Sequence, residues 1–124
     1  MDEFVDLRGP LYEVKANLFR GLAHPVRIRV LELLSASPEV SVSEMLDATG
    51  LESSHLSQHL AVLRRYDLVV GERRGLQVFY SLTDPRVAEL LAVAKALLGG
   101  MLERTTTRLT DEQGAYSAME VAAS

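Results

Sequence analysis

The sequence predicts a mainly helical domain that carries one small β-hairpin and forms a homodimer. Three observations predict this fold class. Apolar residues recur at helical spacing through most of residues 10–104, the period changes to two between Leu68 and Leu82, and the last apolar face is broader than a small domain needs. With 124 residues, 48% of them apolar and 24% charged, the chain has the composition of one folded domain.

Two helices are expected before the central motif. Pro10 suits the first position of a helix that extends to about Leu22, and Pro25 starts a second helix that ends near Ala36. His24, between them, is expected to cap the second helix, with a ligand or proton-sensing role as the alternative. The residues expected to be buried in the second helix are Val26, Val30, Leu31 and Leu34. Arg27 and Arg29 are expected on its outer side, either solvated or in contact with phosphate.

The central motif consists of two short helices. Ser41 and Glu44 form a capping box for a helix from about Val42 to Ala48, which ends before Gly50. A second helix follows within Leu51–Leu68. Its apolar stripe is Leu56, Leu60 and Leu63. Small hydrogen-bonding groups cover its other side, which is typical of a helix that enters the DNA major groove. The residues expected to contact DNA from this helix are Ser53, Ser54, His55, Ser57, Gln58, His59 and Arg64. A scaffold role is the alternative for His59.

Period-two alternation after this helix predicts a hairpin with a charged tip that contains Gly75. A hairpin directly after a helix-turn-helix is typical of the wing of a winged-helix domain. Arg73 and Arg74 at the tip are therefore expected to touch the DNA backbone or the minor groove. The alternative is a soluble turn that carries two arginines.

The last predicted helix begins after Asp84, which is its N-cap, and ends at about Arg104. Its broad apolar face, together with the first helix, predicts a homodimer interface; the alternative is a helix that covers only its own core. The residues expected in this interface are Leu11, Val14, Leu18, Leu90, Leu91, Ala94, Leu97, Leu98 and Met101. Residues 1–9 are expected to be flexible and residues 105–124 to form a loose tail, in which Tyr116, Met119 and Val121 are candidates for local docking.

Composition limits the classes of function. The chain has no cysteine, which excludes disulfides, thiolate metal sites and thiol redox switches. No signal peptide and no membrane span are visible, so a cytoplasmic protein without a membrane partner is expected. The net charge of −4 comes from the two ends, because residues 14–102 together carry +1. This balance disfavours a strongly basic, sequence-blind DNA binder.

No constellation of residues supports an enzyme or a metal site. His55 and His59 have the spacing of a zinc-binding pair, but Leu56 stands where the catalytic glutamate of such enzymes is found, and no third ligand is evident. Neither a glycine-rich phosphate loop nor a Ser/His/Asp set occurs at a known spacing. We therefore expect no enzymatic activity, no metal and no cofactor.

Three stretches of the sequence resemble the ArsR/SmtB family of bacterial winged-helix repressors. They are LAHPVRIRVLELL, SSHLSQHLAVLRRYDLV and RRGLQVFYSL, and the resemblance extends over about residues 10–104. It implies a symmetric dimer that represses transcription from an imperfectly palindromic operator until a signal lowers its DNA affinity. By position, the resemblance also implies that Gln77 contacts DNA from the wing, together with Arg73 and Arg74. The alternative is a winged-helix module that binds protein instead of DNA.

This sequence departs from the family pattern at the sensing positions. Ser41 and Ser43 occupy the stretch where many members carry metal-binding cysteines, and Arg86 replaces a histidine ligand beside Asp84. Leu76 stands where the wing usually has a basic or polar residue. The resemblance therefore implies the fold and DNA binding but not metal sensing. A small-molecule inducer, a different metal site and constitutive binding all remain open as means of control.

Overall fold

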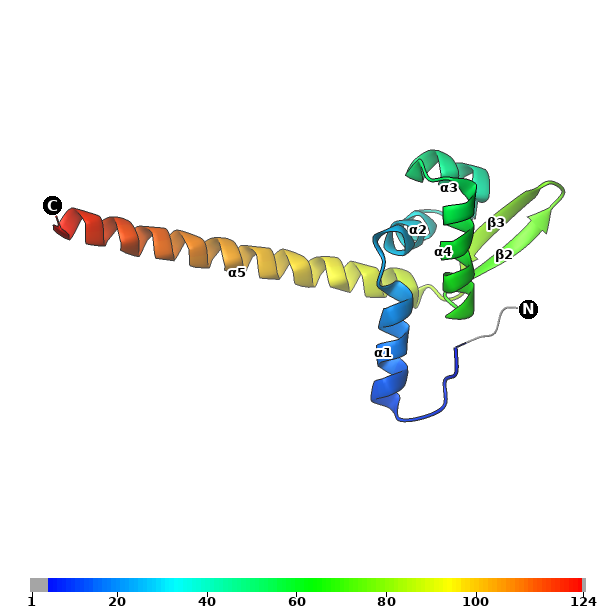
Figure 1. Ribbon diagram of the computed structural model, residues 1–124, viewed down its shortest axis with the longest axis horizontal. Helices are drawn as coiled ribbons and strands as arrows, with labels where there is room; N and C mark the ends of the chain where they lie inside the picture. The colour runs from blue at the N-terminus through cyan, green and yellow to red at the C-terminus, as the bar shows by residue number, and fades with distance from the viewer. Residues whose placement is uncertain (1–4, 124) are drawn as a thin grey trace. The chain divides into compact units, whose positions relative to one another are not determined.

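Five helices and three short strands make up residues 5–123, which the computed structural model describes; for residues 113–123 it describes the backbone alone (Figure 1). The elements are α1 (Leu11–Leu22), α2 (Pro25–Ala36), β1 (Val40–Ser41), α3 (Val42–Thr49), α4 (Ser53–Arg65), β2 (Val69–Arg74), β3 (Gln77–Leu82) and α5 (Arg86–Ala123). The chain divides into two units, residues 1–89 and residues 90–124. The first unit has the winged helix-turn-helix fold that the sequence predicts.

Apolar side chains from α2, α3 and α4 form the core of the first unit. The predicted stripe of α4 is confirmed, because Leu56, Leu60 and Leu63 are all buried. In α2, three of the four residues expected in the core are buried, whereas Val26 is only half-buried. Met45 of α3 is fully buried among them. Since α4 turns its leucines toward this core, its polar residues face outward.

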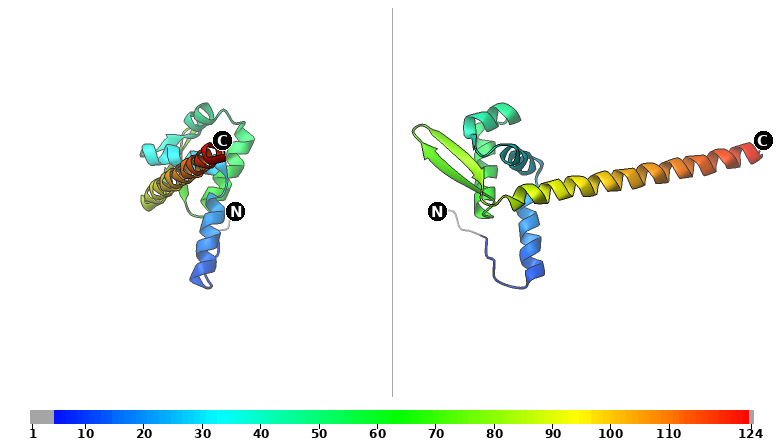
Figure 2. Two further views of the ribbon diagram at one scale, coloured as in Figure 1. Left: turned by 90° about the vertical axis from the view of Figure 1, so that its left-hand side faces the viewer. Right: turned by 180° about the vertical axis from the view of Figure 1, so that it is seen from behind.

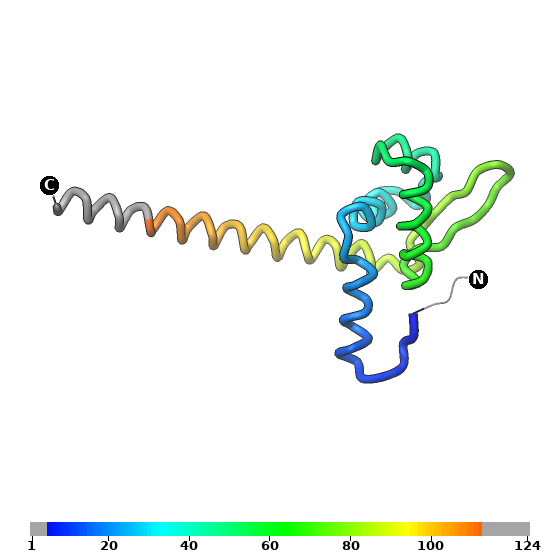
Figure 3. The backbone as a smooth tube through the Cα atoms, in the orientation of Figure 1, coloured from blue at the N-terminus to red at the C-terminus, as the bar shows by residue number. Residues whose placement is uncertain are grey.

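Four predicted helix boundaries have the expected capping groups. The backbone N–H of Val26 donates to His24 Nδ1 at 3.1 Å, and that of Glu44 donates to Ser41 Oγ at 3.1 Å. Gly50 ends α3 with a φ of +68°, which favours glycine. The Arg86 N–H donates to Asp84 Oδ1 at 2.8 Å. The turn between α3 and α4 is short, as the tube in Figure 3 shows, and Gly50 fixes its first residue.

The sheet has three antiparallel strands in the order β1-β3-β2, one more than the predicted hairpin. Strands β2 and β3 pair from Val69 opposite Leu82 to Arg74 opposite Gln77, and Val40 of β1 pairs with Tyr80 of β3. Two views show the tip of this hairpin projecting beyond the helices of the first unit (Figures 1 and 2). Strand β1 escaped prediction because two residues are too few to produce an alternating pattern.

Helix α5 is longer than the sequence analysis expects. It continues past Arg104 without interruption at Gly99 or Gly100, and residues 105–112 are helical where a loose tail was expected. Residues 101–123 contain no proline and only one glycine, so no strong helix breaker interrupts them. Tyr116, Met119 and Val121 lie outside the residues whose side chains are described. Within the described part of the chain, no helix combines the length and apolar character that crossing a bilayer requires.

Candidate nucleic-acid interface

The outward face of α4 brings together most of the polar residues that the sequence singles out. Ser53, Ser54, His55, Ser57 and Gln58 are all exposed. At helical spacing, Ser54 and Gln58 lie opposite the buried leucines, His55 and Ser57 flank them, and Ser53 stands in the first turn. The preceding residue, Glu52, makes no side-chain cap to the first turn. Backbone N–H groups at such a helix start attract phosphate or base acceptors. The face thus offers hydroxyl, imidazole and amide groups, which suit hydrogen bonding to base edges and phosphates.

His59 belongs to a different environment from its neighbours on α4. Its ring centroid lies 4.2 Å from that of His24, and its Nδ1 lies 3.5 Å from Arg27 Nη1. Partial burial, and then the nearby charges of His24, Arg27 and His55, lower the pKa of His59 below its ordinary value of 6.5. These contacts favour the scaffold role for His59.

Arg27 does not lie on the solvated outer side of α2, so that expectation is wrong. Its Nε donates to the carbonyl oxygen of Gly21 at 2.8 Å, and its Nη2 donates to that of Arg20 at 3.1 Å. These are carbonyls of the last turn of α1, which have no partner within the helix. Arg29, by contrast, is exposed as expected. The long Arg27 side chain thus joins α2 to the end of α1.

Arg64, at the last turn of α4, is half-buried and reaches the sheet. Its Nη1 donates a hydrogen bond to the hydroxyl of Tyr80, and the guanidinium carbon lies 5.9 Å from the centre of that ring. Tyr80 itself is buried on β3. Arg64 therefore links α4 to the base of the wing, a role that its position near the end of an amphipathic helix did not reveal.

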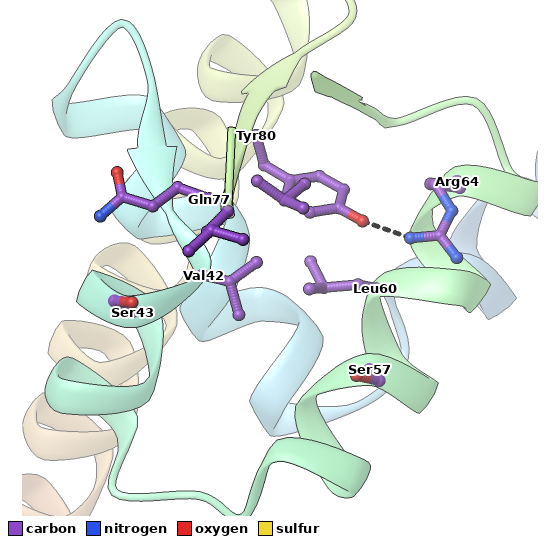
Figure 4. Close-up of a pocket in the computed structure, with 9 residues that line it drawn as sticks. Val42, Ser43, Ser57, Leu60, Arg64, Gln77 and Tyr80 are labelled. Carbon is purple, nitrogen blue, oxygen red and sulfur yellow. Dashed lines mark hydrogen bonds between the residues drawn. The ribbon is translucent and has the colours of Figure 1, made fainter. Parts of the chain in front are cut away.

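A groove of about 360 Å³ lies between α4, the start of α3 and strand β3 (Figure 4). Val42 and Leu60 lie inside it, while Ser43 and Ser57 border it on two sides. Gln77 of the wing also lines it, so the groove joins Ser57 of α4 to a predicted wing residue. Ser43 was considered in the sequence only as a replacement for a cysteine. Ser43 lies beside the exposed polar face of α4 because of the way α3 packs against β3.

The two wing arginines differ in their surroundings. Arg73 is exposed, and its Nε donates only a long bond of 3.3 Å to the carbonyl oxygen of Gly75 in the same turn. Arg74 forms ion pairs with Glu39 at 2.7 Å and with Glu72 at 2.8 Å. Sequence analysis missed Glu39, because it precedes Arg74 by 35 residues and belongs to no local motif.

The residues expected in a dimer interface leave apolar surface exposed on both units. Leu11 of α1 is 66% exposed, and Leu98 and Met101 of α5 are 63% and 45% exposed. Leu97 and Ala94 are also exposed, and the remaining expected residues, Val14, Leu18, Leu90 and Leu91, are half-buried. Apolar side chains at this density on helices are typical of surfaces that another protein chain covers.

The residues at the family's sensing positions do not fit a metal ion. The carboxylate of Asp84 is paired with Arg86 at 2.7 Å, which lowers the pKa of Asp84 to about 2. Ser41 Oγ accepts the hydrogen bond that caps α3, and Ser43 is a poor ligand for soft metals. Among the side chains that the structure describes, no three metal-binding groups lie close enough together to hold an ion.

Comparisons with known proteins agree with this geometry. A helix-turn-helix domain model matches residues 22–72. The HTH-type transcriptional regulator Rv0081 of Mycobacterium tuberculosis is 48% identical over 110 residues, which are 88% of this chain and 96% of that protein. Its crystal structure has a TM-score of 0.73 at 49% identity and covers 80% of this chain and 99% of that one.

Two repressors are also similar to this chain. SmtB of M. tuberculosis is 36% identical over 89 residues, or 72% of this chain and 65% of SmtB. The crystal structure of the transcriptional repressor BigR from Xylella fastidiosa is 35% identical, has a TM-score of 0.65, and covers 69% of this chain and 87% of BigR. The aligned portions include the helix-turn-helix.

Proposed function

Because the chain belongs to the ArsR/SmtB family of winged helix-turn-helix transcriptional regulators, we propose that it is a dimeric repressor that binds an imperfectly palindromic operator. The observation that carries the proposal is α4, which exposes five polar side chains in its first half while three leucines are buried in the core. The wing follows directly, and its Gln77 lines the same groove as Ser57 of α4. Proteins of this family regulate transcription and are not enzymes.

Each α4 enters a major groove, and the two-fold axis of the dimer sets the spacing of two half-sites at about 34 Å. Gln58 is the residue best suited to read a base, because its amide can both donate to and accept from adenine. The serine hydroxyls bond bases or phosphates, and Arg73 neutralises a phosphate.

Dimerisation follows from the apolar surfaces of α1 and α5. Leu11 and Leu98 are more than half exposed in a single chain, and burying such side chains stabilises an interface by about 1.5–3 kcal/mol each. A signal then releases the dimer from DNA. Since the chain has no cysteine, this signal does not act through the thiol chemistry of the metal-sensing members.

The proposal is tested by first identifying the DNA sequences that the protein binds. Duplexes that the protein retains are selected from fragmented genomic DNA, and binding is then measured by fluorescence anisotropy on the selected and on scrambled duplexes at one physiological salt concentration. We expect a preference of about 10³-fold or more for the selected sequence. Equal, weak binding to both duplexes contradicts operator recognition and favours the protein-interaction module.

A Gln58→Ala variant then tests the reading helix. If Gln58 reads a base, affinity for the operator falls by about 1–3 kcal/mol, while affinity for scrambled DNA stays the same. Equal weakening on both duplexes means that Gln58 only positions the backbone. Dimerisation is followed by sedimentation in parallel, because an unchanged dimer with lost DNA binding also argues against the protein-interaction module.

A further inference from the structure

We propose that Arg74 and Glu39 are a positioning pair that holds the wing against the body of the domain, and that Arg74 itself makes no contact with DNA. The inference rests on the proposed function, because it concerns how the wing is presented to an operator. It reverses the expectation for one of the two wing arginines and assigns a role to Glu39, an acidic residue outside every recognised motif.

The Arg74 guanidinium donates hydrogen bonds to two carboxylates along its edge, and one of its faces lies over an aromatic ring. Nη1 and Nη2 donate to the two carboxylate oxygens of Glu39 at 2.7 and 2.8 Å, and Nη2 donates to Glu72 at 2.8 Å. The guanidinium carbon lies 4.7 Å from the centre of the Phe79 ring. Such a two-point bond to a carboxylate fixes orientation as well as distance. Arg74 also holds the pKa of the Glu39 carboxyl below its usual range, in agreement with this geometry.

The ion pair joins two parts of the fold, because Glu39 does not belong to the wing. It lies between α2 and β1, whereas Arg74 ends β2 next to the turn of the hairpin. Strand β1 pairs with β3 only as far as Ser41 opposite Phe79. Arg74 lies closer to the tip of the hairpin than this pairing reaches. The ion pair therefore connects the outer part of the hairpin to the segment that precedes the helix-turn-helix.

The charges around Arg74 also disfavour a phosphate contact. Two carboxylates bind one guanidinium, so the local sum of charge is negative, and a phosphate that approached Arg74 would be repelled by Glu39 and Glu72. Arg73 has no ion pair among the described residues and alternates to the opposite face of β2. The two adjacent arginines therefore have different roles. Arg73 binds phosphate, and Arg74 positions strand β2, which carries Arg73.

The test compares Arg74→Ala with Arg73→Ala on the selected operator over a range of salt concentrations. We expect Arg74→Ala to raise the Kd by up to about fivefold and to leave the slope of log K against log salt unchanged. Arg73→Ala is the matched control, for which the slope falls by about 1. A slope that falls equally for Arg74→Ala means a direct phosphate contact and overturns the proposal.

A charge exchange tests the pair at constant net charge. In a Glu72→Gln background, which removes a competing carboxylate, Arg74→Glu alone should weaken operator binding, and adding Glu39→Arg should restore most of it. A direct DNA contact by Arg74 predicts no rescue, because the exchanged protein presents a carboxylate where phosphate would bind.

Hydrogen exchange of the hairpin amides in free protein provides a readout that does not depend on DNA. Arg74→Ala should increase exchange in the outer part of β2 and β3, while Arg73→Ala should not. Unchanged exchange in Arg74→Ala refutes the positioning role. If the wild-type protein prefers no operator, the proposed function is refuted. Hydrogen exchange then still tests whether Arg74 and Glu39 position the wing.

Discussion

Gly21 lies buried in the last turn of α1, beside the aromatic ring that follows α4. A Cβ added at this position would lie 2.6 Å from Cγ of Tyr66, 2.8 Å from its Cδ1 and 3.0 Å from its Cδ2. These separations are well below van der Waals contact, so a Gly21→Ala substitution forces the ring or α1 to move. Tyr66 is the C-cap residue of α4, and the displacement is therefore transmitted to the end of the reading helix.

Two opposing effects set the size of the change. Overpacking of a well-packed site costs about 1–3 kcal/mol, whereas replacing a helical glycine by alanine recovers about 1 kcal/mol of helix propensity. The net expectation is a loss of about 1 kcal/mol in the free energy of unfolding. For a domain of this size, such a loss lowers the Tm by about 4–8 °C.

Thermal unfolding, followed by circular dichroism at a fixed protein concentration, measures this effect, because the Tm of a dimer depends on concentration. Tyr66→Ala is the matched background, since it removes the ring that the new Cβ meets. There, Gly21→Ala should stabilise the protein by up to about 1 kcal/mol, so the sign of its effect reverses. The reasoning is refuted if Gly21→Ala has the same effect on stability in both backgrounds.

Two further predictions concern the core and the His24–His59 contact. The side chain of Leu63 is completely buried, so Leu63→Ala should lower the free energy of unfolding by about 2–5 kcal/mol in urea titrations; a loss below 1 kcal/mol would mean that the core is not packed as described. His59 has a lowered pKa in the folded protein, so the unfolded chain binds protons more readily, and stability falls as the pH drops below about 6.5. His59→Gln should flatten that decline in a series of Tm measurements against pH, and an unchanged slope would show that another group is responsible.

The parts of the fold that follow from local chemistry could be predicted from the sequence. The caps at His24, Ser41, Gly50 and Asp84 are each formed within a few residues of the helix they end or begin. The leucine stripe of α4 repeats at helical spacing and therefore fixes which face is buried. Given these boundaries, the exposed polar face of α4 follows directly, and so does its position immediately before the hairpin.

The contacts of the long cationic side chains could not be predicted in the same way. Periodicity gives the direction in which Arg27 and Arg64 leave their helices, but each side chain is long enough to bend back and reach another element. Arg27 binds carbonyls of α1, and Arg64 binds Tyr80 on β3. The partner of Arg74 lies 35 residues away in sequence, and only the packed fold brings it near. The C-terminal part of α5 could not be predicted either, because composition alone does not distinguish a long helix from a loose tail.

These contacts change how DNA recognition is expected to work in this protein. Arg27, Arg64 and Arg74 were each considered as DNA contacts, and in the structure each of them also joins two elements of the protein. The groups that face outward in the first part of α4 are hydroxyls, an imidazole and an amide, and an exposed cation, Arg65, follows in its last turn. Hydroxyl and amide groups discriminate between bases but contribute little to sequence-independent attraction to phosphate. A chain with a net charge of −4 can therefore be a specific reader, because its affinity depends on matched hydrogen bonds more than on its overall charge.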